Sequence, residues 1–262
     1  MVLLATSCND DSDDEVQHRL LPTRIARNGI TLFDLVFDTE RRLIRLNYYS
    51  DGEPASFYVY DYNKDGIQES RRYSVYNGNV LDVRSVFTLD NSGRINAIET
   101  YVKENDFEDP FSEMQLSYDP SGRLVGKQLD LASEPDYYIH EYTYSASNVC
   151  IETDKIYHPD KLLEYRILTE YVPADKPMYD HWNDFLLLLI VASHDDDILN
   201  MFCVSSRRRI FDSDGTAVMD WGMTTSAQQF NSDGYLTRQV LTFEDLADGD
   251  KSTWEMTYEY AE

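Results

Sequence analysis

One short segment carries oxygen ligands at the spacing of a calcium-binding loop. Asp61, Asn63 and Asp65 alternate along the chain and are followed by Gly66. In this pattern carboxylate and amide oxygens can converge on a hard cation. Such a loop closes with glutamate at its twelfth position, where this chain has Arg72, whose charge would repel the ion. The same residues fit a tight turn between strands, and we predict the turn rather than a metal site.

Motifs for other metals, for nucleophiles and for phosphate binding do not occur in the sequence. The 5 histidines show no HxH or HExxH spacing, and CxxC, GxSxG and GxxxxGK[ST] are all missing. The 48 acidic residues leave paired carboxylates for glycan hydrolysis as an alternative, but their number gives no reason to choose two. We therefore predict no cofactor and name no catalytic residue.

Two cysteines, Cys150 and Cys203, lie in apolar stretches that are typical of strands. In an oxidising compartment they could form a disulfide. Two buried free thiols fit the same surroundings, and the sequence leaves both alternatives open.

A third cysteine, Cys8, lies in a different context. Leu3 and Leu4 are followed by the small residues Ala5–Ser7, which directly precede it. This arrangement resembles the lipobox of bacterial lipoproteins, in which the cysteine thiol takes a diacylglyceryl group. The resemblance implies that residues 1–8 end a signal peptide and that Cys8 holds the chain to outer-membrane lipid through acyl chains. Eight residues are too few for a whole signal peptide, so we expect the sequence to begin inside it.

The segment after Cys8 is acidic. Asn9–Glu15 contains five acids in seven residues, so it cannot bury apolar surface, and we predict that residues 9–20 are a disordered tether. An acidic run at this place resembles the surface-export signal of Bacteroidetes-type lipoproteins, which implies a position on the cell surface. A solvated spacer that faces the periplasm is the alternative.

The composition of the chain favours one β domain over residues 21–262. Its 262 residues, 42% of them apolar, suffice for a sizeable core in a single barrel or sandwich. Tyrosine occurs 20 times, and it suits half-exposed strands because its ring packs while its hydroxyl reaches water. The net charge of −25 excludes nucleic acid as a partner, since phosphates require a basic surface.

A repeated turn unit is the clearest pattern in the sequence. Each copy has an aromatic or leucine residue, then Asp or Asn, then in most copies a glycine three residues later. Arg41 takes the glycine position in the first copy, and 144–149 and 157–163 are degenerate copies. The first four copies start 25, 27 and 29 residues apart, which is two strands plus two turns. The six copies are Phe37–Leu43, Tyr62–Ile67, Leu89–Ile95, Tyr118–Leu124, Phe211–Gly215 and Phe230–Leu236.

The chemistry of each unit is that of a β-hairpin tip. Asp119 at the first corner can bond the backbone two residues on, and Pro120 sets φ for the next corner. Gly122 then supplies the left-handed residue that closes a type I turn with a bulge. The equivalent glycines are Gly66, Gly93, Gly215 and Gly234.

Alternating segments between the tips predict an all-β fold. We expect strands at 57–62, 84–89, 113–118, 137–144 and 253–260. The unit Tyr118–Leu124 resembles the YD repeat of Rhs-type shells. With its lipobox, acidic tether and series of tips, the chain also resembles a Bacteroidetes lipoprotein family of unknown function. That resemblance implies a porin-like fold, an antiparallel meander curled into an open or nearly closed barrel. Within it we expect one short helix or buried segment near 180–195, because Asp184–Ser193 encloses eight apolar residues.

These observations predict a non-enzymatic surface lipoprotein that acts as a binding or structural module. Tyrosine-rich strands beside Asp and Asn could form a sugar-binding face, which makes a glycan the first ligand to consider. The same tyrosines could instead be core residues and cross-strand pairs. A glycan-active hydrolase and a subunit of an outer-membrane complex are the alternative functions.

Overall fold

The computed structural model of the chain describes residues 21–132, 137–144, 150–157, 163–173 and 203–261. Within these residues the chain forms sixteen β-strands and one short 3-10 helix at Lys103–Asn105. The strands are β1 (Leu21–Arg27), β2 (Ile30–Phe37), β3 (Leu43–Ser50), β4 (Glu53–Asn63), β5 (Gly66–Ser74), β6 (Val80–Leu89), β7 (Ile95–Val102), β8 (Ser112–Tyr118), β9 (Leu124–Leu131), β10 (Tyr137–Tyr144), β11 (Cys150–Tyr157), β12 (Leu163–Pro173), β13 (Cys203–Asp212), β14 (Ala217–Phe230), β15 (Leu236–Asp245) and β16 (Lys251–Ala261).

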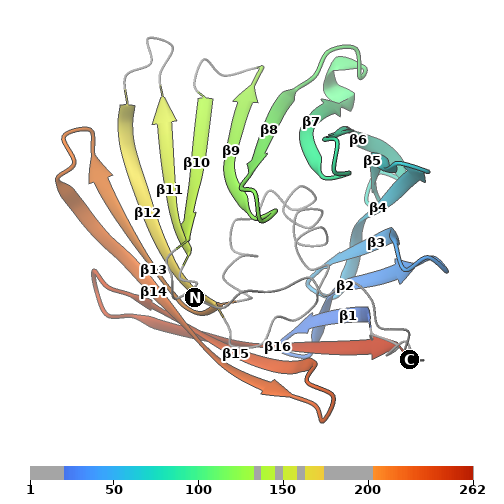
Figure 1. The fold of residues 1–262 in the computed structure, drawn as a ribbon. Helices are drawn as coiled ribbons and strands as arrows, with labels where there is room; N and C mark the ends of the chain where they lie inside the picture. Colours follow the sequence, from blue (N-terminus) through green and yellow to red (C-terminus); the bar gives the residue numbers. More distant parts are fainter. Residues whose placement is uncertain (1–20, 133–136, 145–149, 158–162, 174–202, 262) are drawn as a thin grey trace, which may run out of the picture.

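The strands form one closed antiparallel barrel in which each strand pairs with its neighbours in sequence (Figure 1). Closure comes from the first and last strands, since Leu21 pairs with Ala261 and Arg27 with Met256. The all-β antiparallel meander predicted from the sequence is confirmed. The sequence left open whether the barrel closes, and the structure shows that it does.

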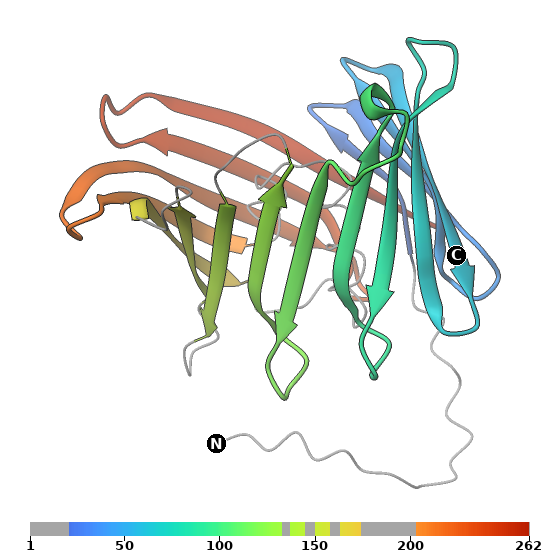
Figure 2. The ribbon, with the colours of Figure 1, turned by 90° about the horizontal axis from the view of Figure 1, so that it is seen from above.

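Consecutive hairpins turn alternately at the two ends of the barrel. The near end, where β1 begins and β16 finishes, carries the turns at 38–42, 63–66, 90–94, 119–123 and 231–235. The far end carries the turns that join β1 to β2, β3 to β4, β13 to β14 and β15 to β16. For β4 to β9, Figure 2 shows the near-end turns along the lower edge of the view and the far-end connections along the upper edge.

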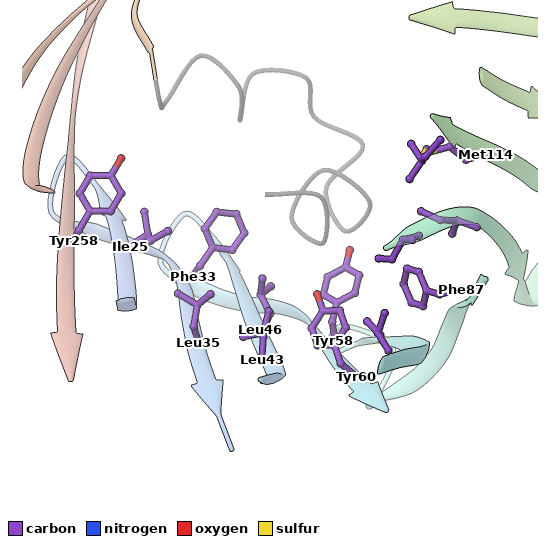
Figure 3. Close-up of a cluster of buried hydrophobic side chains, with 14 of the residues drawn as sticks. Ile25, Phe33, Leu35, Leu43, Leu46, Tyr58, Tyr60, Phe87, Met114 and Tyr258 are labelled. Atoms are coloured by element: carbon purple, nitrogen blue, oxygen red, sulfur yellow. The ribbon is translucent and has the colours of Figure 1, made fainter. Parts of the chain in front are cut away.

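The inner face of the barrel carries the apolar core. Leu46 is fully buried and pairs with Leu35 on one side and Tyr58 on the other, and Figure 3 shows Phe33, Tyr58 and Tyr258 on the inner side of their strands. The buried hydrophobic residues of β1 to β8, β15 and β16 form one cluster on this face. Tyrosine contributes both to this core and to stacked cross-strand pairs, because its ring suits either position.

The outer face carries charged side chains, because successive residues of a strand point to opposite faces. Ion pairs link neighbouring strands on this face at several of the seams. These outer ion pairs are Arg24–Asp34, Arg71–Asp61, Arg84–Glu69, Lys155–Glu141, Arg207–Asp220 and Arg238–Glu255.

Several predictions from the sequence fall outside the described residues. These are the signal-peptide remnant and tether at 1–20 and the helix or buried segment near 180–195. No helix in the described part of the chain is long and apolar enough to cross a membrane.

The two cysteines Cys150 and Cys203 lie on the strands either side of β12. Cys150 pairs with Tyr171, and Cys203 with Pro173. Two strand spacings alone separate their Cα atoms by at least about 9–10 Å, beyond the roughly 7 Å that a disulfide allows.

Candidate functional site

The hairpin tips of the near end share one hydrogen-bond arrangement. At 119–123 the amide of Gly122 donates to the carbonyl of Asp119 over 2.9 Å, and the amide of Asp119 donates to the carbonyl of Arg123 over 2.9 Å. One carboxylate oxygen of Asp119 accepts from the amides of Ser121 and Arg123, each at 2.9 Å. Gly122 has φ 83°, a left-handed conformation. The carboxylate therefore holds the turn while glycine supplies its sharpest bend.

The other copies of the repeat are also turns, in two locations. Gly93 and Gly234 have φ 78° and 87° at the near end, whereas Gly215 has φ 80° at the far end. Gly66 differs, with φ 136°, and a Cβ there would lie 2.8 Å from the side chain of Leu89. Arg41, at the glycine position of the first copy, has φ 66°, so one tip holds a long side chain in the left-handed region.

Three tips are fastened to the next hairpin by a set of three side chains that we call a clasp. In the set Asp119–Arg123–Tyr144, the guanidinium donates to the carboxylate over 2.7 Å and lies 4.5 Å from the centre of the Tyr144 ring. The Tyr144 hydroxyl donates to the carbonyl of Leu124 over 2.8 Å. The two other clasps are Asp38–Arg42–Tyr62 and Asp90–Arg94–Tyr118.

The tyrosine hydroxyl of each clasp acts where the backbone ladder stops. Backbone pairing between β7 and β8 ends at Ala97 and Gln115, and Tyr118 then donates to the carbonyl of Ile95 over 2.6 Å. At the seam of β15 and β16, Tyr260 bonds the carbonyl of Leu236 in the same way, over 2.6 Å. Each hydroxyl thus donates a hydrogen bond to a carbonyl that lies beyond the last backbone pair of its seam.

The electrostatics of the tips keep their aspartates ionised. Backbone hydrogen bonds from Arg94 and Arg123, together with their guanidinium groups, lower the pKa of Asp90 and Asp119. At Asp38 partial burial acts to raise the pKa, but the hydrogen bonds and charge of Arg42 outweigh it and the pKa is lowered. A general acid needs a raised pKa, so these carboxylates are suited to structure rather than to proton donation.

Two of the three side chains of the calcium-like pattern, those of Asp61 and Asn63, have other partners. Asn63 accepts from the amides of Asp65 and Gly66, at 2.8 and 3.1 Å, and so forms the turn. Asp61 is ion-paired with Arg71 on the outer face. In the described residues no group of three or more His, Cys, Asp or Glu side chains could hold a metal ion. The side-chain oxygens of Asn63 and Asp61 thus serve the turn and an ion pair.

A row of polar side chains crosses the inner face from β9 to β11. Lys127 pairs in register with His140, which pairs with Asp154. The Nδ1 atom of His140 lies 2.5 Å from a carboxylate oxygen of Asp154, and both side chains are mostly buried. The alternation of Tyr137–Tyr144 is visible in the sequence, but this pairing is not, because it depends on the register between strands.

Large apolar side chains that remain exposed gather at the far end. Val218, Met219 and Trp221 lie at the start of β14, and Leu246 lies in the neighbouring turn between β15 and β16. Ile30, Tyr48 and Tyr76 are exposed elsewhere on the same rim. Among the described residues, Val36 is the one large, clearly exposed apolar side chain outside this end. The rim of the far end is therefore the candidate binding surface.

Comparisons with known proteins show a shared fold. Neither a scan against protein-family models nor a search of curated proteins finds a match. A porin-like protein from Bacteroides uniformis superposes with a TM-score of 0.56 at 11% identity, over 92% of this chain and 98% of its own. A porin-like protein from Bacteroides vulgatus covers the same shares at 9% identity with a TM-score of 0.47. The porin-like fold implied by the sequence resemblance is thus confirmed, and the likeness extends to the fold alone.

Proposed function

We propose that this chain is a non-enzymatic module that stands in water at the cell surface, is held to the outer membrane through Cys8, and binds a partner at its far end. The observation that carries the proposal is the distribution of side chains across the barrel wall. A barrel that spans a bilayer faces lipid with an apolar band and fills its lumen with polar groups. Here ion pairs lie on the outer face, and the inner face carries the apolar core along β1 to β8, β15 and β16.

The size of this effect supports a barrel in water over a barrel that spans a membrane. Each Arg or Lys on the lipid face costs about 2–4 kcal/mol at the bilayer midplane. The outer ion pairs include Arg84–Glu69 and Lys155–Glu141 near the middle of their strands. With several such pairs around the wall, a bilayer would oppose this barrel strongly, whereas water accommodates it.

The topology supports an anchor at the near end. Residue 21 begins β1 at that end, so a tether from a lipidated Cys8 would reach the barrel there. Such a tether would direct the far-end rim, with Trp221 and its apolar neighbours, away from the membrane. This orientation suits a binding or structural module, or a subunit of an outer-membrane complex.

Two other functions have less support. A sugar-binding face of tyrosines needs free rings, but Phe57 stacks on Tyr73 and Tyr137 on Tyr157, each with ring centres 4.9 Å apart. A glycan therefore remains a candidate ligand mainly through the rim. A hydrolase would need a carboxyl group with a raised pKa. The pKa is lowered at each of six carboxyl groups, those of Asp34, Asp38, Asp90, Asp119, Asp220 and Glu255.

Membrane fractionation and protease shaving of intact cells test this proposal. Wild-type protein should take a palmitate label, pellet with outer membranes and be degraded by protease added outside. Cys8→Ala should take no label and stay in the soluble fraction without detergent. A Cys8→Ala protein that still pellets and needs detergent for extraction would contradict the water-facing barrel. Labelled protein that resists external protease would place the module in the periplasm instead.

A further inference from the structure

We propose that the apolar patch formed by Val218, Met219, Trp221 and Leu246 is a docking surface for a polypeptide segment with basic and apolar side chains. The inference deepens the proposed function and rests on it, since it names the class of partner that the far end binds. Val218 is 63% exposed, Met219 48%, Trp221 41% and Leu246 36%. Apolar side chains gathered on one rim in this way are typical of interaction sites.

Trp221 and Leu246 lie on adjacent segments of the rim, and Val218 and Met219 precede Trp221 on β14. The amide of Leu246 donates to the carbonyl of Trp221 over 3.2 Å, so the turn after β15 lies directly beside β14. Gly222 pairs with Asp245 at the same point. The guanidinium of Arg208 lies 5.2 Å from the centre of the Trp221 ring, which supports the ring from the neighbouring strand. Tryptophan is one of the residue types enriched among those that contribute most to the binding energy of protein interfaces.

Acidic turns surround the patch on two sides. The turn between β13 and β14 carries Asp212 and Asp214, and the turn between β15 and β16 carries Asp248 and Asp250 beside Asp245. The one basic residue next to this second turn, Lys251, is paired with Glu244 over 2.8 Å. An apolar centre with a charged rim is the usual anatomy of a protein interface.

The negative charge of the acidic turns favours a partner with basic side chains. A second copy of this chain would bring its own acidic rim against this one, and the acidic residues 9–15 would be repelled as well. Anionic lipid is disfavoured for the same reason. A segment that places Lys or Arg against the aspartates and a large apolar side chain on Trp221 meets both features of the surface at once.

The experiment uses an 18-residue synthetic peptide of Lys and Leu at helical spacing, titrated against the purified full-length chain. A Glu/Leu peptide of the same pattern, a mixture of neutral oligosaccharides and zwitterionic vesicles are the comparison probes. The variants are Trp221→Ser, Val218→Ser, and the double change Asp248→Asn with Asp250→Asn. Val36→Ser is the matched control, because Val36 is 42% exposed at the other end of the barrel. Unchanged melting temperatures establish that each variant is folded.

We expect the Lys/Leu peptide to bind and the Glu/Leu peptide not to bind. Trp221→Ser and Val218→Ser should each weaken binding at least about tenfold, and the double Asn variant should reduce its salt dependence, while Val36→Ser leaves both unchanged. Equal affinity for wild type and both serine variants would reduce the binding to diffuse charge attraction and overturn the proposal. Oligosaccharide or vesicle binding that is lost in Trp221→Ser would also overturn it, yet would keep the far end as the binding surface. If no probe binds, this docking site is wrong, whereas the surface-anchored module is tested separately by fractionation of Cys8→Ala.

Discussion

Single residues at the tips of the repeat fix the backbone of this barrel, and among the described repeat tips Arg41 is the exception to glycine. Its φ of 66° lies where other tips have glycine, and a side chain in that region costs about 1–2 kcal/mol. Arg41→Gly should therefore raise the free energy of unfolding, offset in part by the greater freedom of glycine in the unfolded chain. We expect a net gain of roughly 0.5 kcal/mol, or about 1–2 °C in melting temperature for a chain of this size.

The reverse change at an equivalent position is the control. Gly122 has φ 83° and open space for a Cβ, with the nearest atom, on Arg94, 3.6 Å away. Gly122→Ala therefore tests the backbone conformation alone and should lower the free energy of unfolding by about 1 kcal/mol. If both substitutions shift the melting temperature in the same direction, φ is not what distinguishes these tips.

The aspartates of the clasps should make stability depend on pH. A carboxyl group with a lowered pKa stabilises the folded chain above its unfolded pKa, about 3.9, and the contribution is lost as pH falls through the lower folded value. Asp119→Asn keeps a turn-forming oxygen, as Asn63 and Asn231 show at other tips, but removes the charge. In urea denaturation we expect wild type to exceed Asp119→Asn in stability at pH 7, and the gap to close below pH 4. A gap that stays constant down to pH 2.5 would contradict the lowered pKa.

At the scale of elements, the clasp explains what the repeat does. Its aromatic residue is not only the start of one tip. The ring of Tyr118 also contacts Arg94 of the preceding tip, and the Tyr118 hydroxyl donates to the carbonyl of Ile95. Arginine five positions into the unit, at 42, 94 and 123, was visible in the sequence. The tyrosine partner of each arginine was not, because the contact joins residues 20 to 24 positions apart across a strand seam.

A double-mutant cycle tests the clasp as a link between hairpins. Arg94→Ala and Tyr118→Leu each remove one side of a contact whose guanidinium lies 4.7 Å from the ring centre. We expect a coupling energy of about 0.5–1 kcal/mol in the free energy of unfolding. Arg42→Ala with Tyr118→Leu is the matched control, because Arg42 contacts Tyr62 instead. If the effects of Arg94→Ala and Tyr118→Leu on the free energy of unfolding are strictly additive, the contact does not link the two hairpins energetically.

Local patterns predicted the strands well and their faces less well. The predicted strand 137–144 coincides with β10, and 57–62 lies inside the longer β4. Alternation showed that the strands had two faces, but both faces carry tyrosine, so the inner one could not be chosen. In the structure the ion pairs identify the outer face of the strands. They could not be read from the sequence, because they depend on the register between neighbouring strands. The apolar rim around Trp221 was missed because exposure of a single Trp, Met or Val is not encoded locally.

At the scale of the whole molecule, the two ends of the barrel differ in composition. The near end has three clasps in which each aspartate is paired with an arginine. The far end has acidic turns such as 245–250 beside exposed apolar side chains. A chain with net charge −25 thus places an acidic, apolar rim at the end opposite to residue 21. That asymmetry links the fold to the proposed orientation.

Closure of the barrel is the property that no local pattern could predict. It joins β1 to β16 through residues more than 220 positions apart, including the amide of Asn28, which donates to the carbonyl of Glu255 over 2.7 Å. A long antiparallel meander can remain open or close, and the choice depends on strand number, tilt and stagger summed over all seams. The sequence shows where the hairpins lie, but it does not show the combined effect of strand number, tilt and stagger.

Circular permutation tests the closed barrel directly. Leu21 and Ala261 are paired across the seam, so a short Gly-Ser linker can join them as one more near-end hairpin. New termini at Gly78, in the exposed turn between β5 and β6 where φ is 78°, interrupt no strand. We expect this permutant to fold with a melting temperature within about 5 °C of the unpermuted 21–262 chain, a change of roughly 1–2 kcal/mol. A permutant opened at Val59, inside β4, should fail to fold, because it divides the strand that buries Tyr58 and Tyr60. If the Gly78 permutant fails as well while the linker-free 21–262 chain folds, β1 and β16 do not form a seam equivalent to the others.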